Sequence, residues 1–547
     1  MKTFALIRYF KRTLTHSTLG FCIFVIIALF YGFSLNTVLQ YNESFNWQQL
    51  WQDSYLQHIL LFSSGQALLS SLLSVCLGLI LARTLFYLHF PAKSFLLKLL
   101  SLTFVLPSLL AIFGILGVYG QTGWLAQLCT WLKIDWQPHI YGLSGILIAH
   151  LFFNIPLACR LFLQSLNSIP SEQHQLAAQL SIRGWQFIRL VEWNALRPQI
   201  FPTMLLIFIL CFTSFAIVLT LGGSPKFSTL EVAIYQALLF DFDLAKAAVY
   251  ALLQLLCCFI LFALYSGFNQ NSPIFLNQRQ IWYTAPKTAV KIWHVFWLSL
   301  FILFISLPLL NIITSAFSST AHLFNELTNR QLWRSIGYSV SIAPLSALLS
   351  LSLASAMLLF TRQLEWQSRP KLAQFFVNSS LLILAIPMLI VAVGLYLIVA
   401  QHQFAHWQLF AIVVVCNALS ALPFVLKIIN QPMHQNMQYY EKLCQSLGIK
   451  GWQRFSLIEW QSLAPSFKYA FALACALSLG DFTAIALFGG QDFTSLPYLL
   501  YQQLGSYHSE QASITALVLL IIFLAIFLLI ETAHHENNDD PIKKRNF

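Results

Sequence analysis

The sequence predicts an all-α membrane protein with twelve transmembrane helices, arranged as two parallel six-helix repeats. Three observations support this fold class. The 547-residue chain is 58% hydrophobic and 9% charged, with a mean hydropathy of +0.71, whereas soluble domains average about 25% charged residues. Its apolar residues form runs of about 20 residues, the length that crosses a bilayer as a helix. One polar stretch occurs twice, which indicates an internal duplication.

The apolar runs define the expected spans. A transmembrane barrel would show alternating segments of about ten residues instead, so we expect helices. The N-terminal run follows a basic segment, but it lacks a small-x-small cleavage site, and we expect it to stay as a helix. The spans lie at about 18–38, 57–84, 95–118, 141–163, 199–221 and 245–267 in the first half, and at about 293–315, 336–360, 376–400, 406–428, 466–488 and 511–531 in the second.

Charge predicts the orientation of the spans. In this topology 25 of the 30 Lys and Arg residues fall on one side, including the basic N-terminus and the tail Lys543-Lys544-Arg545. The positive-inside rule makes that side the cytoplasm, so both termini are expected there. No basic patch with interleaved aromatic residues suggests a nucleic-acid partner. The five exceptions are Lys133, Lys226, Lys246, Arg330 and Arg334.

The duplicated stretch, 175–198 and 442–465, reveals the repeat. Leu180, Gly184, Trp185, Glu192, Trp193 and Pro198 recur 267 residues later as Leu447, Gly451, Trp452, Glu459, Trp460 and Pro465. Upstream, Pro107 and Gly114 match Pro387 and Gly394 at an offset of 280, so the offset changes only in a loop. Both copies lie on the same side of the membrane, which makes the repeats parallel.

This repeat divides the chain into five segments. The expected divisions are 1–56 (N-terminal cytoplasmic segment, first helix and outside loop), 57–267 (first repeat), 268–331 (cytoplasmic linker, seventh helix and outside loop), 332–531 (second repeat) and 532–547 (cytoplasmic tail).

Each copy of the stretch predicts a docking element for a soluble partner. In the first copy we expect a short helix with Ser171 as N-cap, a break from Ser181 to Gly184, and a second short helix that enters the membrane at Pro198. A helix-turn of this kind fits a groove in a partner. An ordinary amphipathic loop is the alternative, but its occurrence twice favours docking. The two expected apolar faces are Leu176, Ala177 and Leu180, and Trp185, Ile188 and Val191.

The two stretches resemble the EAA loops of ABC importer permeases, which begin Glu-Ala-Ala and carry a Gly six residues after the Glu. Gly448 matches this glycine, whereas the first copy has Ser181, and Gln175 and Lys442 replace the opening acid. The resemblance implies a type I ABC importer permease fold that contacts ATPase subunits through both loops. The implied docking residues are Gln175, Leu176, Ala177, Ser181, Gly184, Trp185, Lys442, Leu443, Cys444, Gly448, Gly451 and Trp452.

Nearly the whole chain is similar to the thiamine/thiamine-diphosphate importer permeases of Gram-negative bacteria. The resemblance implies a multi-pass inner-membrane subunit that carries thiamine and thiamine diphosphate into the cytoplasm. Its implied partners are two ATPase subunits, a periplasmic thiamine-binding protein and membrane lipid. The alternatives are a ferric-iron or other small-solute ABC permease, and an ion-coupled secondary transporter. The similar segments include 113–120, 443–449, 480–482 and 501–507.

No motif for catalysis, a metal or a cofactor stands out. The chain has no Gly-x-x-x-x-Gly-Lys-Ser/Thr run, so we expect ATP hydrolysis on a separate chain. Asp481 lies in an apolar run and Ser214 occupies the equivalent position. An acid inside a span indicates a function, so both are candidates for the translocation path or for gating. Asp241 and Asp243 could guide a cation or a binding protein, with solvated loop charges as the alternative.

Overall fold

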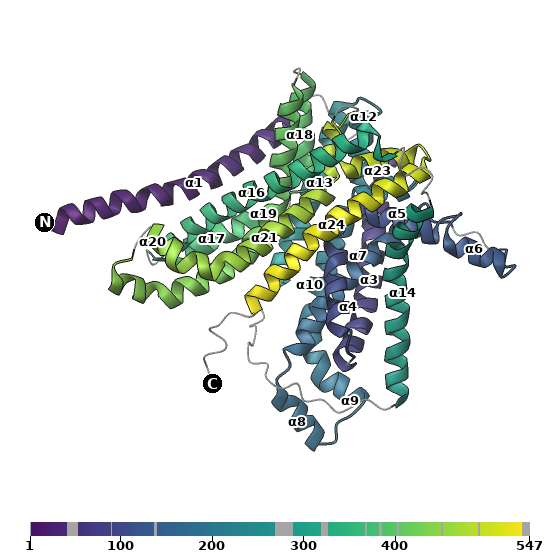
Figure 1. Ribbon diagram of the computed structural model, residues 1–547, viewed down its shortest axis with the longest axis horizontal. Helices are drawn as coiled ribbons and strands as arrows, with labels where there is room; N and C mark the ends of the chain where they lie inside the picture. Colours follow the sequence, from purple (N-terminus) through teal and green to yellow (C-terminus); the bar gives the residue numbers. More distant parts are fainter. Residues whose placement is uncertain are drawn as a thin grey trace. The chain divides into compact units, whose positions relative to one another are not determined.

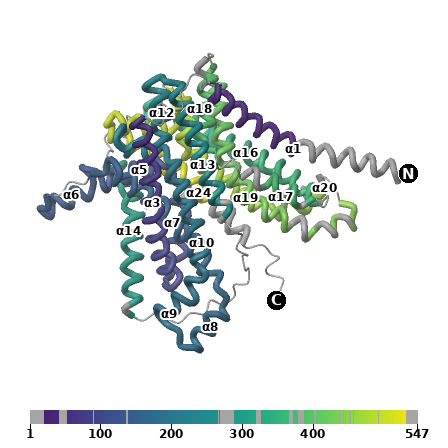
Figure 2. The backbone as a smooth tube through the Cα atoms, turned by 180° about the vertical axis from the view of Figure 1, so that it is seen from behind, coloured from purple at the N-terminus to yellow at the C-terminus, as the bar shows by residue number. Residues whose placement is uncertain are grey.

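The computed structural model describes residues 2–40, 53–88, 90–135, 139–268, 288–318, 326–366, 369–381, 386–401, 404–449, 452–490 and 493–538. All regular elements in these ranges are helices (Figure 1), which confirms the all-α class. The chain forms two compact units (Figure 2). Unit 1 comprises 1–44, 323–507 and 517–547, and unit 2 comprises 45–322 and 508–516.

Unit 2 contains the first repeat. Helices α3 and α7 pack together along its centre, and α10 lies against both of them. The repeat consists of α3 (Ser54–Tyr87), α4 (Lys93–Val105), α5 (Ser108–Tyr119), α6 (Trp124–Trp131), α7 (Leu143–Asn167), α8 (Ser171–Gln179), α9 (Trp185–Phe187), the π-helix η1 (Ile188–Glu192), α10 (Trp193–Phe212), α11 (Ala216–Leu221), α12 (Leu230–Leu239) and α13 (Leu244–Phe268).

Unit 1 contains the second repeat, and α16, α19 and α21 pack together in its core. The repeat consists of α16 (Arg330–Trp366), α17 (Pro370–Leu381), α18 (Met388–Gln401), α19 (His406–Leu447), α20 (Trp452–Arg454), the π-helix η3 (Phe455–Glu459), α21 (Trp460–Gly480), α22 (Thr483–Phe488), α23 (Leu496–Gly505) and α24 (Ser509–Asn538). Residues 508–516, at the start of α24, are the part of this repeat that groups with unit 2.

Each unit also contains the first helix of the other half of the chain. Helix α1 (Lys2–Gln40) packs on α16 and α18 in unit 1, and α14 (Thr288–Ser318) packs on α3 and α5 in unit 2. The two units are therefore each built from chain segments that are far apart in the sequence.

Eleven helical segments in the described ranges are long and apolar enough to cross a membrane. The expected span 376–400 is not among them, because its described part consists of α17 and α18, with residues 382–385 outside the described ranges. The expectation of one continuous helix over 95–118 is wrong: α4 ends at Val105 and α5 begins at Ser108. Pro107 explains this break, because it has no N–H and forces extended backbone on Leu106, whose ψ is 131°.

The spans expected at 199–221 and 466–488 are also interrupted. Helix α10 ends at Phe212 and α11 begins at Ala216, while α21 ends at Gly480 and α22 begins at Thr483. The two interruptions lie at equivalent positions, and they contain Ser214 and Asp481. Both candidate translocation residues therefore sit where the backbone leaves its helix.

The two docking stretches differ in how they begin. In the second copy, α19 is one unbroken helix of 42 residues, and its C-terminal end belongs to the docking stretch. In the first copy the chain breaks at Pro170, where the equivalent residue is Met437. The expectation that Ser171 is the N-cap is wrong, because Pro170 occupies that position and Ser171 is the first helical residue.

Helices α1 and α14, which each pack on the repeat of the other half of the chain, approach that repeat closely at two glycines. A β-carbon on Gly114 in α5 would lie 2.5 Å from the carbonyl oxygen of Pro308 in α14. A β-carbon on Gly394 in α18 would likewise collide with the backbone of Ser34 in α1, whose hydroxyl donates a hydrogen bond to the Val391 carbonyl at 2.9 Å. Small residues at these points let the helix backbones pack directly against each other.

We predict that Gly114→Ala lowers the free energy of unfolding by about 1–3 kcal/mol, because backbone atoms of α14 must move to admit the methyl group. The matched control is Gly65→Ala in α3, where an added β-carbon meets no atom within 4 Å. The control should be neutral or stabilising by about 0.5–1 kcal/mol. Thermal unfolding of the purified protein in detergent measures both, and equal stability of the two variants would contradict this account of the packing.

Candidate functional site

Both docking stretches reverse direction at a residue with left-handed backbone. Ser181 has a φ of +54°, and Gly448, its equivalent 267 residues later, has a φ of +64°. Most residues avoid this region of backbone space, but glycine enters it at little cost. The turn geometry is therefore the same in the two copies although only the second has the glycine.

The same backbone hydrogen bond closes both turns. The N–H of Ile182 donates to the carbonyl of Ala177 at 2.9 Å, and the N–H of Ile449 donates to the carbonyl of Cys444 at 3.0 Å. A bond across this spacing with a left-handed residue inside it is the Schellman ending of a helix. Ala177 and Cys444 are buried in their units, so they anchor the helix ends and present no surface to a partner.

Two leucines, one helical turn apart, are exposed in each copy. Leu176 and Leu180 are 56% and 62% exposed, and their equivalents Leu443 and Leu447 are 48% and 62% exposed. We call each pair a leucine pair. The expectation that Ala177 shares their face is wrong, because it is buried on the other side of α8 beside His174. Further matched exposed residues are Leu190 and Leu457, and Trp193 and Trp460.

The remaining candidate docking residues of the first copy are also exposed. Gln175 is exposed in α8, and Trp185, at 75%, is exposed directly after Gly184, whose φ is +61°. In the second copy Lys442 lies in α19 and Trp452 begins α20. Gly451 is outside the described residues.

A buried glutamate attaches the first docking stretch to the centre of unit 2. Glu192 is the last residue of η1 and is fully buried. Its carboxylate accepts a charged hydrogen bond from Arg83 Nε at 2.7 Å and a second hydrogen bond from the hydroxyl of Tyr87. Both partners belong to the last turns of α3. Since a buried carboxylate is costly without such partners, the contact fixes η1 against α3.

The second docking stretch repeats this attachment in unit 1. Glu459 ends η3 and is buried. Its Oε1 atom accepts a hydrogen bond from Arg362 Nη1 at 2.8 Å and forms an ion pair with Arg454, whose Nε atom is also 2.8 Å away. Arg362 lies near the end of α16, as Arg83 does near the end of α3. We call these contacts the glutamate clamps. The sequence showed that the glutamates repeat, but their partners were not among the predicted site residues.

The ring of His174, on the buried side of α8, packs against two aromatic side chains. It stacks on Phe86 at a centroid distance of 6.1 Å and lies 5.6 Å from Phe187. Burial lowers the pKa of His174, and the nearby Glu192 carboxylate only partly opposes this change. The imidazole is therefore a neutral packing group near pH 7, and it does not add charge to the docking surface.

Asp481 hydrogen-bonds to the backbone that its own helix break leaves open. Its Oδ1 atom accepts from the N–H of Thr483 at 2.8 Å, and its Oδ2 atom accepts from the hydroxyl of Ser420 at 3.5 Å. The cavity beside it, which Asn417 and Ser478 also line, has a volume of about 10 Å³. That is room for about one water molecule. The Asp481 carboxylate thus satisfies the first N–H of α22, while Phe482 is the N-cap residue.

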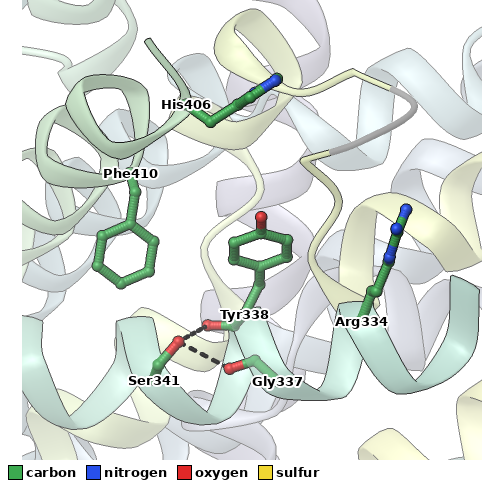
Figure 3. A pocket seen from close by; sticks show the side chains of 6 residues that line it. All are labelled: Arg334, Gly337, Tyr338, Ser341, His406 and Phe410. Carbon is green, nitrogen blue, oxygen red and sulfur yellow. Dashed lines mark hydrogen bonds between the residues drawn. The ribbon is translucent and has the colours of Figure 1, made fainter.

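A larger cavity of about 570 Å³ lies in unit 1 between the first turns of α16 and α19 (Figure 3). Ser341 donates its hydroxyl to the carbonyls of Gly337 and Tyr338 at 2.7 and 3.0 Å. The cavity contains none of the predicted site residues, and it lies at the end of α16 opposite Arg362. Its lining is Arg334, Gly337, Tyr338, Ser341, His406 and Phe410.

Comparison with known proteins gives one family match and two similar relatives. The family model described as binding-protein-dependent transport system inner membrane component matches residues 74–271 and 365–536. The chain is 56% identical to the thiamine transport system permease protein of Haemophilus influenzae over 528 residues, which cover 96% of this chain and 98% of that protein. It is 43% identical to the Escherichia coli protein of the same description over 499 residues, covering 89% and 90% of the two chains.

We predict opposite effects from exchanging the turn residues between the copies. Ser181→Gly should stabilise the first docking turn by about 1–2 kcal/mol, because it relieves the left-handed strain, and Gly448→Ser should destabilise the second by a similar amount. A β-carbon on Gly448 meets no atom within 4 Å, so steric collision does not contribute. Hydrogen exchange of the amides around each turn measures the change. Slower exchange in Gly448→Ser than in the parent would contradict the prediction.

Proposed function

The chain belongs to the family of binding-protein-dependent transport system inner membrane components, and we propose that it is the membrane-spanning subunit of an ATP-driven thiamine importer. The protein is a multi-pass membrane protein with the type I permease fold. Its cargo is thiamine and thiamine diphosphate, taken from the periplasm to the cytoplasm. The support for the cargo is the 56% identity with a thiamine transport system permease over almost the whole of both chains.

The proposed coupling of transport to ATP hydrolysis rests on the matched leucine pairs. Two copies of one surface, with the same exposed leucines and the same left-handed turn, are suited to two copies of one partner. An amphipathic helix end that presents leucines one turn apart fits an apolar groove. We therefore assign each leucine pair to one ATPase subunit, which hydrolyses ATP on a separate chain.

The glutamate clamps give the docking loops a mechanical role. A force on α8 reaches α3 through Glu192 and Arg83, and a force on the end of α19 reaches α16 through Glu459 and Arg362. Closure of the two ATPases on ATP then moves the central helix of each unit, and not only a surface loop. This motion opens the path to the cytoplasm.

The orientation follows from the distribution of charge. The docking loops lie on the side that carries 25 of the 30 Lys and Arg residues, which is the cytoplasmic side. Both termini lie on that side as well. Asp481 has a structural role in this scheme, because its carboxylate holds the start of α22 and the cavity beside it is too small for thiamine.

Uptake into proteoliposomes tests the proposed function. The chain is reconstituted with its ATPase and a periplasmic thiamine-binding protein, with ATP inside, and labelled thiamine is supplied outside. Uptake that requires ATP and competes with unlabelled thiamine diphosphate is expected. Uptake driven by an ion gradient without the ATPase would refute the importer, and ATP-driven uptake of ferric iron in place of thiamine would refute the cargo.

We predict that Leu176→Asp and Leu443→Asp each reduce thiamine uptake at least tenfold and weaken co-purification of the ATPase, because each places a charge in an apolar contact. The matched control is Leu132→Asp, which is 50% exposed in the loop expected on the opposite side of the membrane. Uptake by this control should equal that of the parent. If the control and Leu176→Asp lose the same fraction of uptake, the leucine pairs are not the docking surface.

A further inference from the structure

The cavity between the first turns of α16 and α19 combines a guanidinium, a phenol hydroxyl and an imidazole. Arg334 and Tyr338 extend from α16 and His406 extends from α19, so the whole cavity belongs to unit 1. In Figure 3 the Tyr338 hydroxyl points into the open space beside the other two side chains. The volume of about 570 Å³ is within the usual range of small-molecule sites. We call this space the α16–α19 cavity.

Aromatic packing holds Tyr338 in place at the cavity. Its ring lies edge-on to Phe493 at a centroid distance of 4.9 Å, and it lies 6.3 Å from the ring of Phe410. Phe493 is only 2% exposed, so Tyr338 rests on the core of unit 1. The position of its hydroxyl is therefore fixed by the fold.

One hydrogen bond aligns this part of α16 with the start of α3 in unit 2. The hydroxyl of Ser339 accepts from the N–H of Leu496 at 2.8 Å, and the hydroxyl of Ser63 accepts from the N–H of Leu230 at 3.1 Å. The two serines have the same role in the two repeats. Here the helices therefore correspond at an offset of 276 residues.

The equivalent place in unit 2 lacks two of the polar groups. At this offset Arg334 corresponds to His58, and Tyr338 corresponds to Phe62. Phe62 keeps an aromatic contact, at 5.7 Å from Phe227, but it has no hydroxyl. The ring contact thus serves the fold in both units, whereas the guanidinium and the phenol hydroxyl are additions to it in unit 1.

Positive charge gathers at the α16–α19 cavity against the general charge distribution. Arg330 and Arg334 are two of the five basic residues expected on the non-cytoplasmic side, where such residues are depleted. They lie one turn apart on α16, and both are exposed. No carboxylate is among the described residues that line the cavity. A guanidinium has five N–H donors, so Arg334 has donors for an oxyanion besides its other contacts.

Two tryptophans place the cavity at the level of the membrane surface. Trp333 precedes Arg334 and is 58% exposed, and Trp407 follows His406 and is 70% exposed. Exposed tryptophans collect at the depth of the lipid headgroups. Both α16 and α19 contain segments long and apolar enough to cross a membrane, and these segments begin at 330 and 406. The cavity therefore lies where two spans leave the bilayer.

An exposed apolar strip continues from the cavity along α16. Leu345 and Leu348 lie one to two turns after Ser341, which lines the cavity, and they are 45% and 54% exposed. Helical spacing puts them on the same face as Gly337 and Ser341. A ligand with a polar head in the cavity and apolar chains attached to it matches this arrangement.

We propose that the α16–α19 cavity binds the phosphate of an anionic phospholipid, whose acyl chains lie along the apolar strip of α16. Arg334 and Tyr338 donate hydrogen bonds to the phosphate oxygens, and the imidazole of His406 donates from α19. Guanidinium groups suit phosphate in charge and in geometry. The bound phosphate joins the first turns of the two helices. In the proposed orientation the lipid belongs to the periplasmic leaflet.

A soluble phosphate compound shares only part of this chemistry. Inorganic phosphate and thiamine diphosphate also present oxyanions to Arg334, but neither has an acyl chain for the strip that contains Leu345 and Leu348. The tryptophans beside the cavity likewise indicate a site at the lipid headgroups. These observations favour the phospholipid, and competition by the two soluble compounds tests the choice.

Three variants separate the cavity from surface charge. Arg334→Gln removes the guanidinium and keeps the space. Gly337→Leu keeps both arginines and fills the space, and the helix accepts it because an added β-carbon at Gly337 meets no atom within 4 Å. The matched control is Arg330→Gln, which removes the same charge one turn away from a residue outside the cavity lining. A fourth variant, Tyr338→Phe, introduces the residue that unit 2 has at this position.

Native mass spectrometry of the full chain, purified and delipidated in detergent, measures the binding of added phosphatidylglycerol. Thermal unfolding in parallel checks the fold of each variant. We expect Arg334→Gln and Gly337→Leu to weaken binding of the first lipid by about tenfold or more, since each removes charge-assisted hydrogen bonds to the phosphate. Tyr338→Phe should weaken it by about threefold, the worth of one neutral hydrogen bond. Arg330→Gln should bind as the parent does, and the parent should prefer phosphatidylglycerol to zwitterionic phosphatidylcholine.

Three results would overturn the proposal. Parental affinity in a folded Gly337→Leu variant would show that the lipid does not enter the cavity, and this variant decides even if Arg334→Gln does not fold. An equal loss in Arg330→Gln and Arg334→Gln would assign the binding to surface charge alone. Displacement of the first lipid by inorganic phosphate or thiamine diphosphate would assign the cavity to a soluble phosphate. Transport is not measured, so the outcome is independent of the proposed function.

Discussion

A buried carboxylate beneath each docking stretch determines how that end of its unit is built. Glu192 and Glu459 are buried, where a carboxylate without partners is costly, and each pairs with an arginine near the end of the central helix of its unit. The docking stretch is thereby attached to α3 or α16 and cannot move separately from it. The π-helical turns that end at these glutamates, the stacked His174 and the exposed leucine pairs are all arranged around this attachment.

The two copies agree closely in the docking stretches and differ more elsewhere. The docking turns share backbone conformation, hydrogen bonding and leucine exposure although Ser181 replaces glycine in the first copy. By contrast, the helix interruption has Asp481 in one repeat and Ser214 in the other. Under the proposed function, two copies of one ATPase would constrain the two docking stretches equally, whereas the path for an asymmetric solute would not require such symmetry.

The sequence predicted the helical class, the duplication and the helix-turn of the docking stretch, because apolar run length, a constant offset and turn residues are local signals. The prediction was wrong at Pro107: the length of the apolar run indicated one helix, although the proline interrupts it. In the first copy, no proline marks the helix break at Ser214, which is equivalent to the break at Asp481. The packing of α1 and α14 on the opposite repeats was not predictable either, because the sequence of an apolar helix does not indicate which helices it packs against.

The arginine partners in the glutamate clamps could not be predicted from local sequence spacing. Arg83 lies 109 residues before Glu192, so no local spacing joins them. A signal did exist: an arginine lies near the end of the first helix of each repeat, as Arg83 and Arg362, on the side of the membrane where the repeated glutamate is also expected. A basic residue and a repeated acid at the same membrane depth could have been paired on that ground.

A double-mutant cycle on one clamp tests the central claim most directly. ATP-driven thiamine uptake is measured for Arg83→Gln, Glu192→Gln and the double variant in proteoliposomes. If the clamp transmits the ATPase motion, Arg83→Gln loses most of the uptake because it leaves a buried carboxylate unpaired, and adding Glu192→Gln recovers part of it. Losses that multiply in the double variant would show that the two residues act independently, and the coupling through the clamp would be wrong.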